Sequence, residues 1–376
     1  SVTAGGSGMG SIVAAGPVQL AYANAVAREI SSQRGVSLTA TGPVTGSIAA
    51  TGPVEVSATG LVSAAVTSGS SASIASVAGV SSSVTAGGGV NLTSSQGALS
   101  SQVNSGGTVN VSAAGPVTGS IRATGPVAVN ASGPVSATVR TDNSANISSA
   151  SGVSSQVTAG QGVQVTATQG AVTGSITAGG AVAVNAAGPV SAAVSTTGAA
   201  NVVSTSGGVS SVIDAGGPVA VSAPGPVTST IRSGSTVELT SSTPIDVQIN
   251  GGAVTVNAPG GQVGGVFGEI TTRDGGTFVV NDQPVIGNGE TDARQIIVDA
   301  FLAPVGGAVG AAGELVLPSG LSLALIAPQG VSASRPPVIV NSVERLGELL
   351  REGYTAIIID LGQSGLAEEQ EELTAT

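Results

Sequence analysis

Aliphatic residues recur along this chain with a period of 18 residues. In one copy Val44, Ile48, Val54 and Val56 occupy positions 1, 5, 11 and 13 of the repeat. A fixed period near twenty residues is typical of repeat architectures, in which stacked copies bury a common core. Position 1 can be assigned fifteen times, with gaps of 17 to 19 residues, to Met9, Val26, Val44, Val62, Val80, Leu99, Val117, Val135, Val153, Val172, Val190, Val209, Val227, Ile245 and Val263.

The spacing inside one repeat predicts two short strands joined by tight corners. Positions 11 and 13 share one face of a strand, as do positions 1, 3 and 5, where position 3 is small, as in Gly46 and Ala64. Gly-Pro often precedes position 1 or position 11, and both residues suit corners because proline lacks an N–H and glycine accepts positive φ. Equivalent strands 18 residues apart cannot form hairpins, so we predict a parallel β-solenoid of about fifteen coils over residues 1–267. Polar residues at position 14, such as Thr39, should face outward, and the small residues after them, such as Ala40, should face inward.

Composition limits the chemistry that the chain can perform. It contains no Cys, His, Lys or Trp, which excludes a Ser-His-Asp triad, a thiol nucleophile and a Schiff-base lysine, and argues against a zinc site. We therefore predict no catalytic, cofactor-binding or metal-binding residues, and no enzymatic activity. The net charge of −11 disfavours nucleic acid as a partner. The apolar run 300–313 is too short to span a membrane.

A few charged and aromatic residues stand out from the neutral repeats. Arg122 and Arg140 fall at the same position of adjacent coils with Asp142 nearby, and Asp214 and Arg232 repeat that arrangement. We interpret these as surface charges that form at most a weak ion pair. The alternative is the charged cluster of a polysaccharide lyase or hydrolase. Tyr22 and Tyr354 are isolated, and we expect both to be structural.

Two further patterns suggest surface functions. An ice-binding face would need aligned Thr-x-Thr motifs, but Thr39/Thr41 and Thr166/Thr168 are not repeated between these two copies. Asn-x-Ser/Thr sequences could carry glycans, although matches are expected by chance in so Ser/Thr-rich a chain; they occur at Asn91, Asn110, Asn130 and Asn146.

The repeats fade after Phe267, and residues 268–376 predict a small α/β or α+β domain that caps the solenoid or serves its assembly and ends in an acidic tail. The predicted elements are a strand pair turning near Asn281 and Asp282; a helix capped by Thr291 or Asp292 that carries Asp299 on its surface; a hairpin turning at 318–320; and a β-α-β unit with strands at 338–340 and 356–360 and a helix from Asn341 or Ser342 to Gly353. We expect the last two strands to form a parallel pair.

The repeats resemble the β-solenoids of filamentous haemagglutinin-type and other bacterial surface proteins. The resemblance lies in the Val-x-Val frame with Gly, Asn and Ser turns, as in "GGTVNVSAAGPV" (106–117) and "GGAVAVNAAGPV" (179–190). It implies export to the cell surface or the extracellular space of a bacterium, and roles in adhesion, sheaths or surface fibres. Bactofilins, which are cytoskeletal β-helices that polymerise end to end, are similar in coil length.

The ends of the predicted solenoid suggest how it acts. The aliphatic frame is already running at Met9 and reaches back to Val2, so we expect no N-terminal cap, and an open solenoid end can pair with another chain. We therefore expect a non-enzymatic subunit that stacks head to tail on copies of itself in an extracellular filament, sheath or surface layer. The alternative is a monomeric, rod-like adhesin that binds glycan or protein along its lateral face. Since the chain starts at Ser1 without an initiator methionine, we expect a processed form or a fragment.

Overall fold

The computed structural model describes the backbone of residues 2–243 and 245–257, with side chains from residue 5 onward, and beyond them the backbone of short strands between residues 266 and 360. It is a mainly β, parallel solenoid of about 14 turns with an 18-residue period, against the fifteen expected. Contacts divide the chain into two units, Ser1–Ser222 and Ala223–Thr376.

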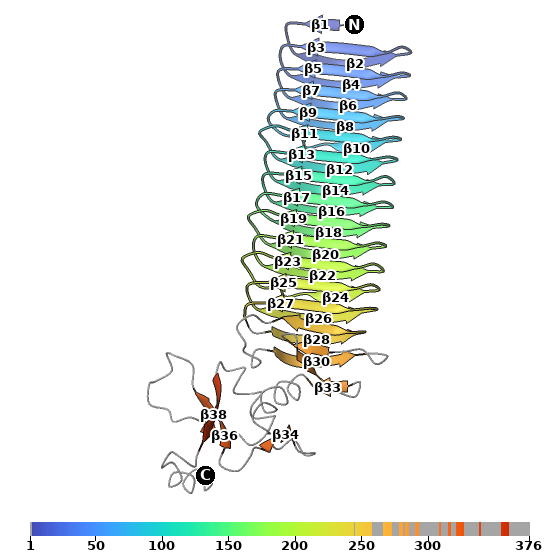
Figure 1. Cartoon of the computed structure of the whole chain (residues 1–376). Helices are drawn as coiled ribbons and strands as arrows, with labels where there is room; N and C mark the ends of the chain where they lie inside the picture. The colour runs from blue at the N-terminus through green and yellow to red at the C-terminus, as the bar shows by residue number, and fades with distance from the viewer. Residues whose placement is uncertain are drawn as a thin grey trace, which may run out of the picture. The chain divides into compact units, whose positions relative to one another are not determined.

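In the first unit each coil contributes one even-numbered and one odd-numbered strand (Figure 1). Most even-numbered strands have seven residues and most odd-numbered strands five, but two even-numbered strands have only four. The even-numbered strands are β2 (Gly8–Ala14), β4 (Val26–Ser32), β6 (Val44–Ala50), β8 (Val62–Ser68), β10 (Ser83–Ala86), β12 (Leu99–Ser105), β14 (Val117–Ala123), β16 (Val135–Thr141), β18 (Val153–Ala159), β20 (Val172–Ala178), β22 (Val190–Thr196) and β24 (Val212–Ala215). The odd-numbered strands are β1 (Val2–Ala4), β3 (Val18–Tyr22), β5 (Val36–Ala40), β7 (Val54–Ala58), β9 (Ala72–Ser76), β11 (Val90–Ser94), β13 (Val109–Ala113), β15 (Val127–Ala131), β17 (Ala145–Ser149), β19 (Val163–Ala167), β21 (Val182–Ala186) and β23 (Ala200–Ser204), with β25 (Val219–Ala223) at the end of the unit.

Each strand pairs in parallel with its equivalent in the next coil, and equivalent positions stack. Val44 is the register partner of Val62, and Val62 that of Val80, which confirms the predicted columns. The three side chains are completely buried, and burial alternates strictly along strands such as β8. Each fully buried valine contributes about 1.5–3 kcal/mol relative to an exposed one. The core is therefore a set of aliphatic columns between two sheets.

The polar and small columns also lie where the sequence places them. Thr39 and Ser57 face outward, whereas Ala40 and Ala58 are buried. At the corners, the position-1 N–H of Val26 donates to the carbonyl oxygen of Pro43 in the next coil (2.8 Å), and that of Val117 to Pro134 (3.0 Å). Proline thus serves the ladder through its carbonyl group, where its missing N–H has no effect.

Hydroxyl groups of buried serine and threonine residues form hydrogen bonds with backbone groups at the corners. Buried Ser68, at position 7, donates to the carbonyl oxygens of Gly52 (2.9 Å) and Ser71 (2.9 Å), and accepts from the N–H of Ser70 (3.2 Å). Ser149, at position 15, bonds the carbonyl of Gly133 in the same way (2.8 Å). Where position 7 or 15 is alanine these bonds are not made, so the hydroxyls add a second tie between coils at selected corners.

Position 3 departs from the expectation that it faces the core in every coil. Ala64 is buried there, but Gly46, Gly119 and Gly174 are exposed and have φ of +105°, +112° and +114°. A Cβ on Gly119 would lie 2.1 Å from the carbonyl oxygen of Ser101 in the preceding coil. Glycine is required at these places because the backbone turns locally out of the regular strand conformation.

These glycines mark a larger repeat of three coils and 55 residues. Position 3 runs Gly, Ala, Ser through the blocks 44–98, 117–171 and 172–226, with the single coil 99–116 between the first two blocks. In each block the alanine N–H approaches the hydroxyl of the serine, namely Ala64 to Ser82 (3.4 Å), Ala137 to Ser155 (3.3 Å) and Ala192 to Ser211 (3.4 Å). Each block also contains one 19-residue coil, whose extra residue lies in the corner after position 15.

Two predicted position-1 residues are wrong. Gly8, not Met9, is the register partner of Val26, and the Met9 side chain is 75% exposed. At the other end Val266, not Val263, is the partner of Ile245, because 21 residues rather than 18 separate the two strands.

The second unit continues with parallel pairs and then changes to antiparallel ones. β26 (Val227–Ser233), β28 (Ile245–Gly251) and β30 (Val266–Thr272) pair in parallel, as do β27 (Val237–Ser241), β29 (Val254–Asn257) and β31 (Phe278–Val280). β31 forms the predicted antiparallel pair with β32 (Gln283–Val285), and β30 pairs antiparallel with β33 (Glu290–Asp292). Thr291 and Asp292 thus lie in a strand, and the helix predicted after them falls outside the described residues.

The last strands correct two expectations. β35 (Leu315–Val316) pairs with β34 (Ala308–Val309) and not with β36 (Leu321–Ile326), so the hairpin predicted at 318–320 is wrong. β37 (Val338–Ile339) and β38 (Thr355–Asp360) run in the same direction, but both pair antiparallel with β36 and not with each other. The helix predicted between them, Tyr354, Asp299 and the acidic tail lie outside the described residues, and the small domain stays a prediction.

Candidate functional site

The outer surface of the even-numbered strands in the first unit is a regular surface built from equivalent strands. We call it the even-strand face and define it by positions 2, 4 and 6 of β2 to β24. Alternation along each strand directs these side chains outward, away from the buried valines. Position 2 carries an unbroken column of exposed hydroxyl residues, namely Thr45, Ser63, Ser81, Ser100, Thr118, Ser136, Ser154, Thr173, Ser191 and Ser210.

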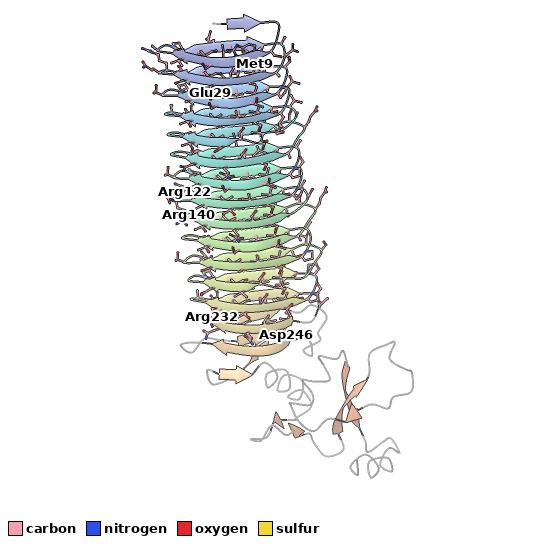
Figure 2. The ribbon with its side chains drawn as sticks, turned by 180° about the vertical axis from the view of Figure 1, so that it is seen from behind. Met9, Glu29, Arg122, Arg140, Arg232 and Asp246 are labelled. Atoms are coloured by element: carbon pink, nitrogen blue, oxygen red, sulfur yellow. The ribbon has the colours of Figure 1, made fainter. Side chains whose placement is uncertain are left out.

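Two arginines on this face lie directly beside each other. Arg122 of β14 and Arg140 of β16 are register partners at position 6, and both are exposed. They lie one above the other on the same side of the stack (Figure 2). Asp142 follows in the corner after β16, but among the described residues no ion pair within 4.0 Å joins it to either arginine. The predicted neighbourhood of the two arginines is confirmed, whereas the weak ion pair is not found.

The second predicted charged pair, Asp214 and Arg232, is divided between the two units and stays a prediction. Asp214 lies at position 6 of β24 in the first unit, and Arg232 lies at position 6 of β26 in the second. The register partner of Arg232 within its own unit is Asn250.

A third charged group was not anticipated from the sequence. Gly8 leaves room at position 1 of its coil, and a Cβ there would lie 2.7 Å from the Tyr22 ring and 2.8 Å from Nε of Arg28. The Arg28 guanidinium lies 5.4 Å from the centre of the Tyr22 ring, a cation–π distance. Neither the Tyr22 hydroxyl nor Arg28 Nε has a hydrogen-bond partner. The signal in the sequence is Arg28 itself, because position 3 is otherwise small in the coils that follow it in the first unit.

Beside Arg28 the surface is hollowed. An open hollow of about 500 Å³ is lined by Gly10, Ser11, Ala27, Arg28, Glu29 and Gly46. It follows from the two position-3 glycines that flank Arg28, since neither carries a side chain to fill the groove. Tyr22 is 4% exposed, and its ring takes the volume that a position-1 valine fills elsewhere.

The asparagine motifs lie on the odd-numbered strands, and the threonine motifs extend from these strands into the corners that follow them. Asn91 and Asn110 are register partners, and Nδ2 of Asn110 donates to Oδ1 of Asn91 (2.9 Å). The Thr41 hydroxyl donates to the carbonyl oxygen of Ala23 in the preceding coil. Its hydroxyl is therefore engaged in the corner and is not presented as part of a regular Thr-x-Thr array.

Within residues 5–243 and 245–257, no three His, Cys, Asp or Glu side chains lie close enough to hold a metal ion. In the part of the chain that the structure describes, no helix has the length and apolar character needed to cross a bilayer.

A scan against protein-family models and searches of curated proteins and of solved structures give no match to this chain.

Proposed function

We propose that this chain is a non-enzymatic structural subunit that assembles end to end into an extracellular filament, sheath or surface layer, most naturally at a bacterial cell surface. The resemblance of the repeats to bacterial surface solenoids supports the location. The partner in the assembly is a second copy of the same chain, docked head to tail.

The observation that carries this proposal is the repetition of one pairing pattern through the stack. Within the first unit a coil accepts the next coil through backbone hydrogen bonds in a constant register, so any exposed coil is a template for an equivalent one. Among the described residues β1 pairs with β3 alone, and its other edge has no partner strand. Contact between unlike surfaces that does not close into a ring produces an open filament.

Light scattering of the purified chain across a concentration series, followed by electron microscopy, tests the proposal. We expect scattering mass to rise with concentration and filaments of constant width to appear. A chain that remains strictly monomeric at high concentration would overturn end-to-end assembly.

Two matched variants locate the contact. Consecutive N–H groups of a strand point to opposite edges, so Thr3→Pro and Ala4→Pro each remove one N–H, one toward β3 and the other toward the open edge. We expect the variant that alters the open edge to assemble less while its circular dichroism stays unchanged. Equal assembly by both variants and the parent chain would exclude this edge as the contact.

The even-strand face supports a second candidate function, a rod-like adhesin that binds glycan or protein laterally. The observation in its favour is the exposed hydroxyl column from Thr45 to Ser210, which offers hydrogen-bond donors and acceptors at every coil. Binding by a chain held below its assembly concentration would favour this candidate over a purely structural role.

A further inference from the structure

The three-coil blocks allow the two arginines to be compared with equivalent residues of the same chain. The first two coils of each block carry Gly and Ala at position 3. Position 6 of these two coils holds Ala49 and Thr67 in the first block, and Thr177 and Ser195 in the third. In the second block the same two positions hold Arg122 and Arg140. The blocks share backbone pairing and core, so the fold does not require arginine at either place.

The arrangement is also unfavourable for the folded chain by itself. Register partners in adjacent parallel strands lie about 4.8 Å apart, and like charges at such positions repel. Arg122 and Arg140 are the only charged residues between Glu55 and Asp142, and no ion pair among the described residues offsets them. Since the fold does not need this pair of like charges, the two arginines are best explained by a ligand that they bind.

We propose that Arg122 and Arg140 form a binding site for the carboxylate or sulfate groups of an anionic polysaccharide. Two guanidinium groups one coil apart can hold one anionic group between them through charge-assisted hydrogen bonds. The inference gives the lateral-face adhesin its ligand class and rests on that candidate; it does not depend on end-to-end assembly.

The surroundings of the pair suit a sugar polymer. The exposed side chains around the pair at positions 4 and 6 are neutral and can form hydrogen bonds: Asn104 precedes the pair at position 6, and Gln102, Ser120, Thr138 and Gln156 lie at position 4. Asp142, in the corner after β16, is the one acidic residue in these coils. The neutral side chains match the hydroxyl groups of sugars on either side of the anionic group. The first unit also contains four arginines and four acidic residues, so it does not repel a polyanion as the net charge of the whole chain would suggest.

The same surface fits single-stranded nucleic acid poorly. Such binding relies on aromatic side chains on which bases stack. Tyr22 is the only aromatic residue in the first 257 residues, and it is buried. A polyanion with hydroxyl groups and no bases is the better match.

The test immobilises the full chain on a biosensor and compares polygalacturonate, dextran sulfate and neutral dextran. The double variant Arg122→Thr with Arg140→Ser reproduces the residues of the third block and should fold normally. We expect it to bind the charged polymers about tenfold more weakly than the parent chain, or worse. We expect binding by the parent chain to fall strongly at about 0.5 M NaCl, because the contact is exposed to solvent. The matched control Arg232→Thr, a single arginine at position 6, should bind like the parent.

Two controls separate loss of the site from loss of fold or assembly. The double variant should melt at or slightly above the temperature of the parent, because the repulsion is removed, and its light scattering should match that of the parent. Which polymer binds more tightly distinguishes a uronate from a sulfated glycan.

The proposal is overturned if the double variant binds the charged polymers as the parent does, or if none of the charged polymers binds. If neutral dextran binds as tightly as the charged polymers, the proposed anion site is wrong, but binding of glycan along the lateral face remains supported. Tighter binding of single-stranded DNA than of either glycan would identify a phosphate polymer as the ligand instead.

Discussion

At the scale of single residues, the carbonyl groups of one coil decide which side chains the next coil can carry. The clearest case is position 3, where Gly119 and Gly174 lie against the carbonyl oxygens of Ser101 and Ser155. The coils that carry Ala64 or Ser82 there keep an inward side chain instead. Sequence variation at this position is therefore constrained by the backbone beneath it as well as by the core.

Gly119→Ala should lower the free energy of unfolding by about 2–4 kcal/mol, because it combines positive φ with a backbone clash. A Cβ there would lie 2.1 Å from the carbonyl oxygen of Ser101, at φ of +112°. Gly10→Ala is the matched control: φ is +96° but no atom lies within 4 Å, so we expect a loss of only about 1–2 kcal/mol. Urea unfolding measures both, and equal losses would show that the clash contributes nothing.

Ser68→Ala should lower the free energy of unfolding by about 1–2 kcal/mol, because the carbonyl of Gly52 and the N–H of Ser70 lose their partner. Alanine fits without strain, since Ala50 and Ala86 occupy the same position in the adjacent coils. Ser63→Ala changes an exposed hydroxyl of the same strand and should alter stability by less than about 0.5 kcal/mol. Unfolding midpoints that do not separate the two variants would contradict a structural role for the corner hydroxyl.

At the scale of the element, the unit that can be moved as a whole is the three-coil block. Deleting residues 117–171 joins Pro116 to Val172 and places Gly174 over Ser101, where Gly119 lies in the parent chain. We expect the shortened chain to keep its β spectrum and to melt within about 5 °C of the parent, since stability is set by contacts between neighbouring coils.

A deletion that ignores the period provides the control. Removing residues 117–125 takes out β14 but leaves β15, so β12 loses its seven-residue partner and the two sheets no longer alternate. We expect this chain to lose its cooperative melting transition in calorimetry. If it melts like the block deletion, the coil is not the unit of folding.

The sequence predicts much of the solenoid because each structural position in a coil is filled by the same kind of residue. Val44, Val62 and Val80 lie in a column as expected, and proline and glycine mark the corners. The prediction fails where residues from other positions fill the core. Tyr22 and Arg28 occupy the space beside Gly8, so position 1 of this coil is a glycine and not the apolar Met9 that the pattern predicts.

Other features of the structure cannot be predicted from the local sequence pattern. The outward position of Gly46 depends on a carbonyl group of the preceding coil, which a single repeat does not reveal. In the C-terminal strands, β36 lies between β37 and β38, and pairing partners so far apart in the chain are not specified by local patterns. At the candidate site, adjacency of Arg122 and Arg140 followed from the period alone, whereas the missing ion pair depends on side-chain geometry.

At the scale of the whole molecule, stability within the first unit should vary along the stack. An inner coil is held by neighbours on both sides, whereas β1 is paired only with β3 among the described residues. Hydrogen exchange measured below the assembly concentration should therefore be slower for amides of β12 to β18 than for those of β1 to β4. Uniform exchange rates would mean that the unit opens in a single cooperative step.

The three-coil block also bears on how a gene for such a chain can change. Tandem duplication of 55 codons would add about 14 Å of stack at about 4.8 Å per coil, and would create no junction that the parent lacks. The length of the stack can then be selected separately from ligand binding. A charged pair acquired by one copy of the block stays in that copy while uncharged copies are added beside it.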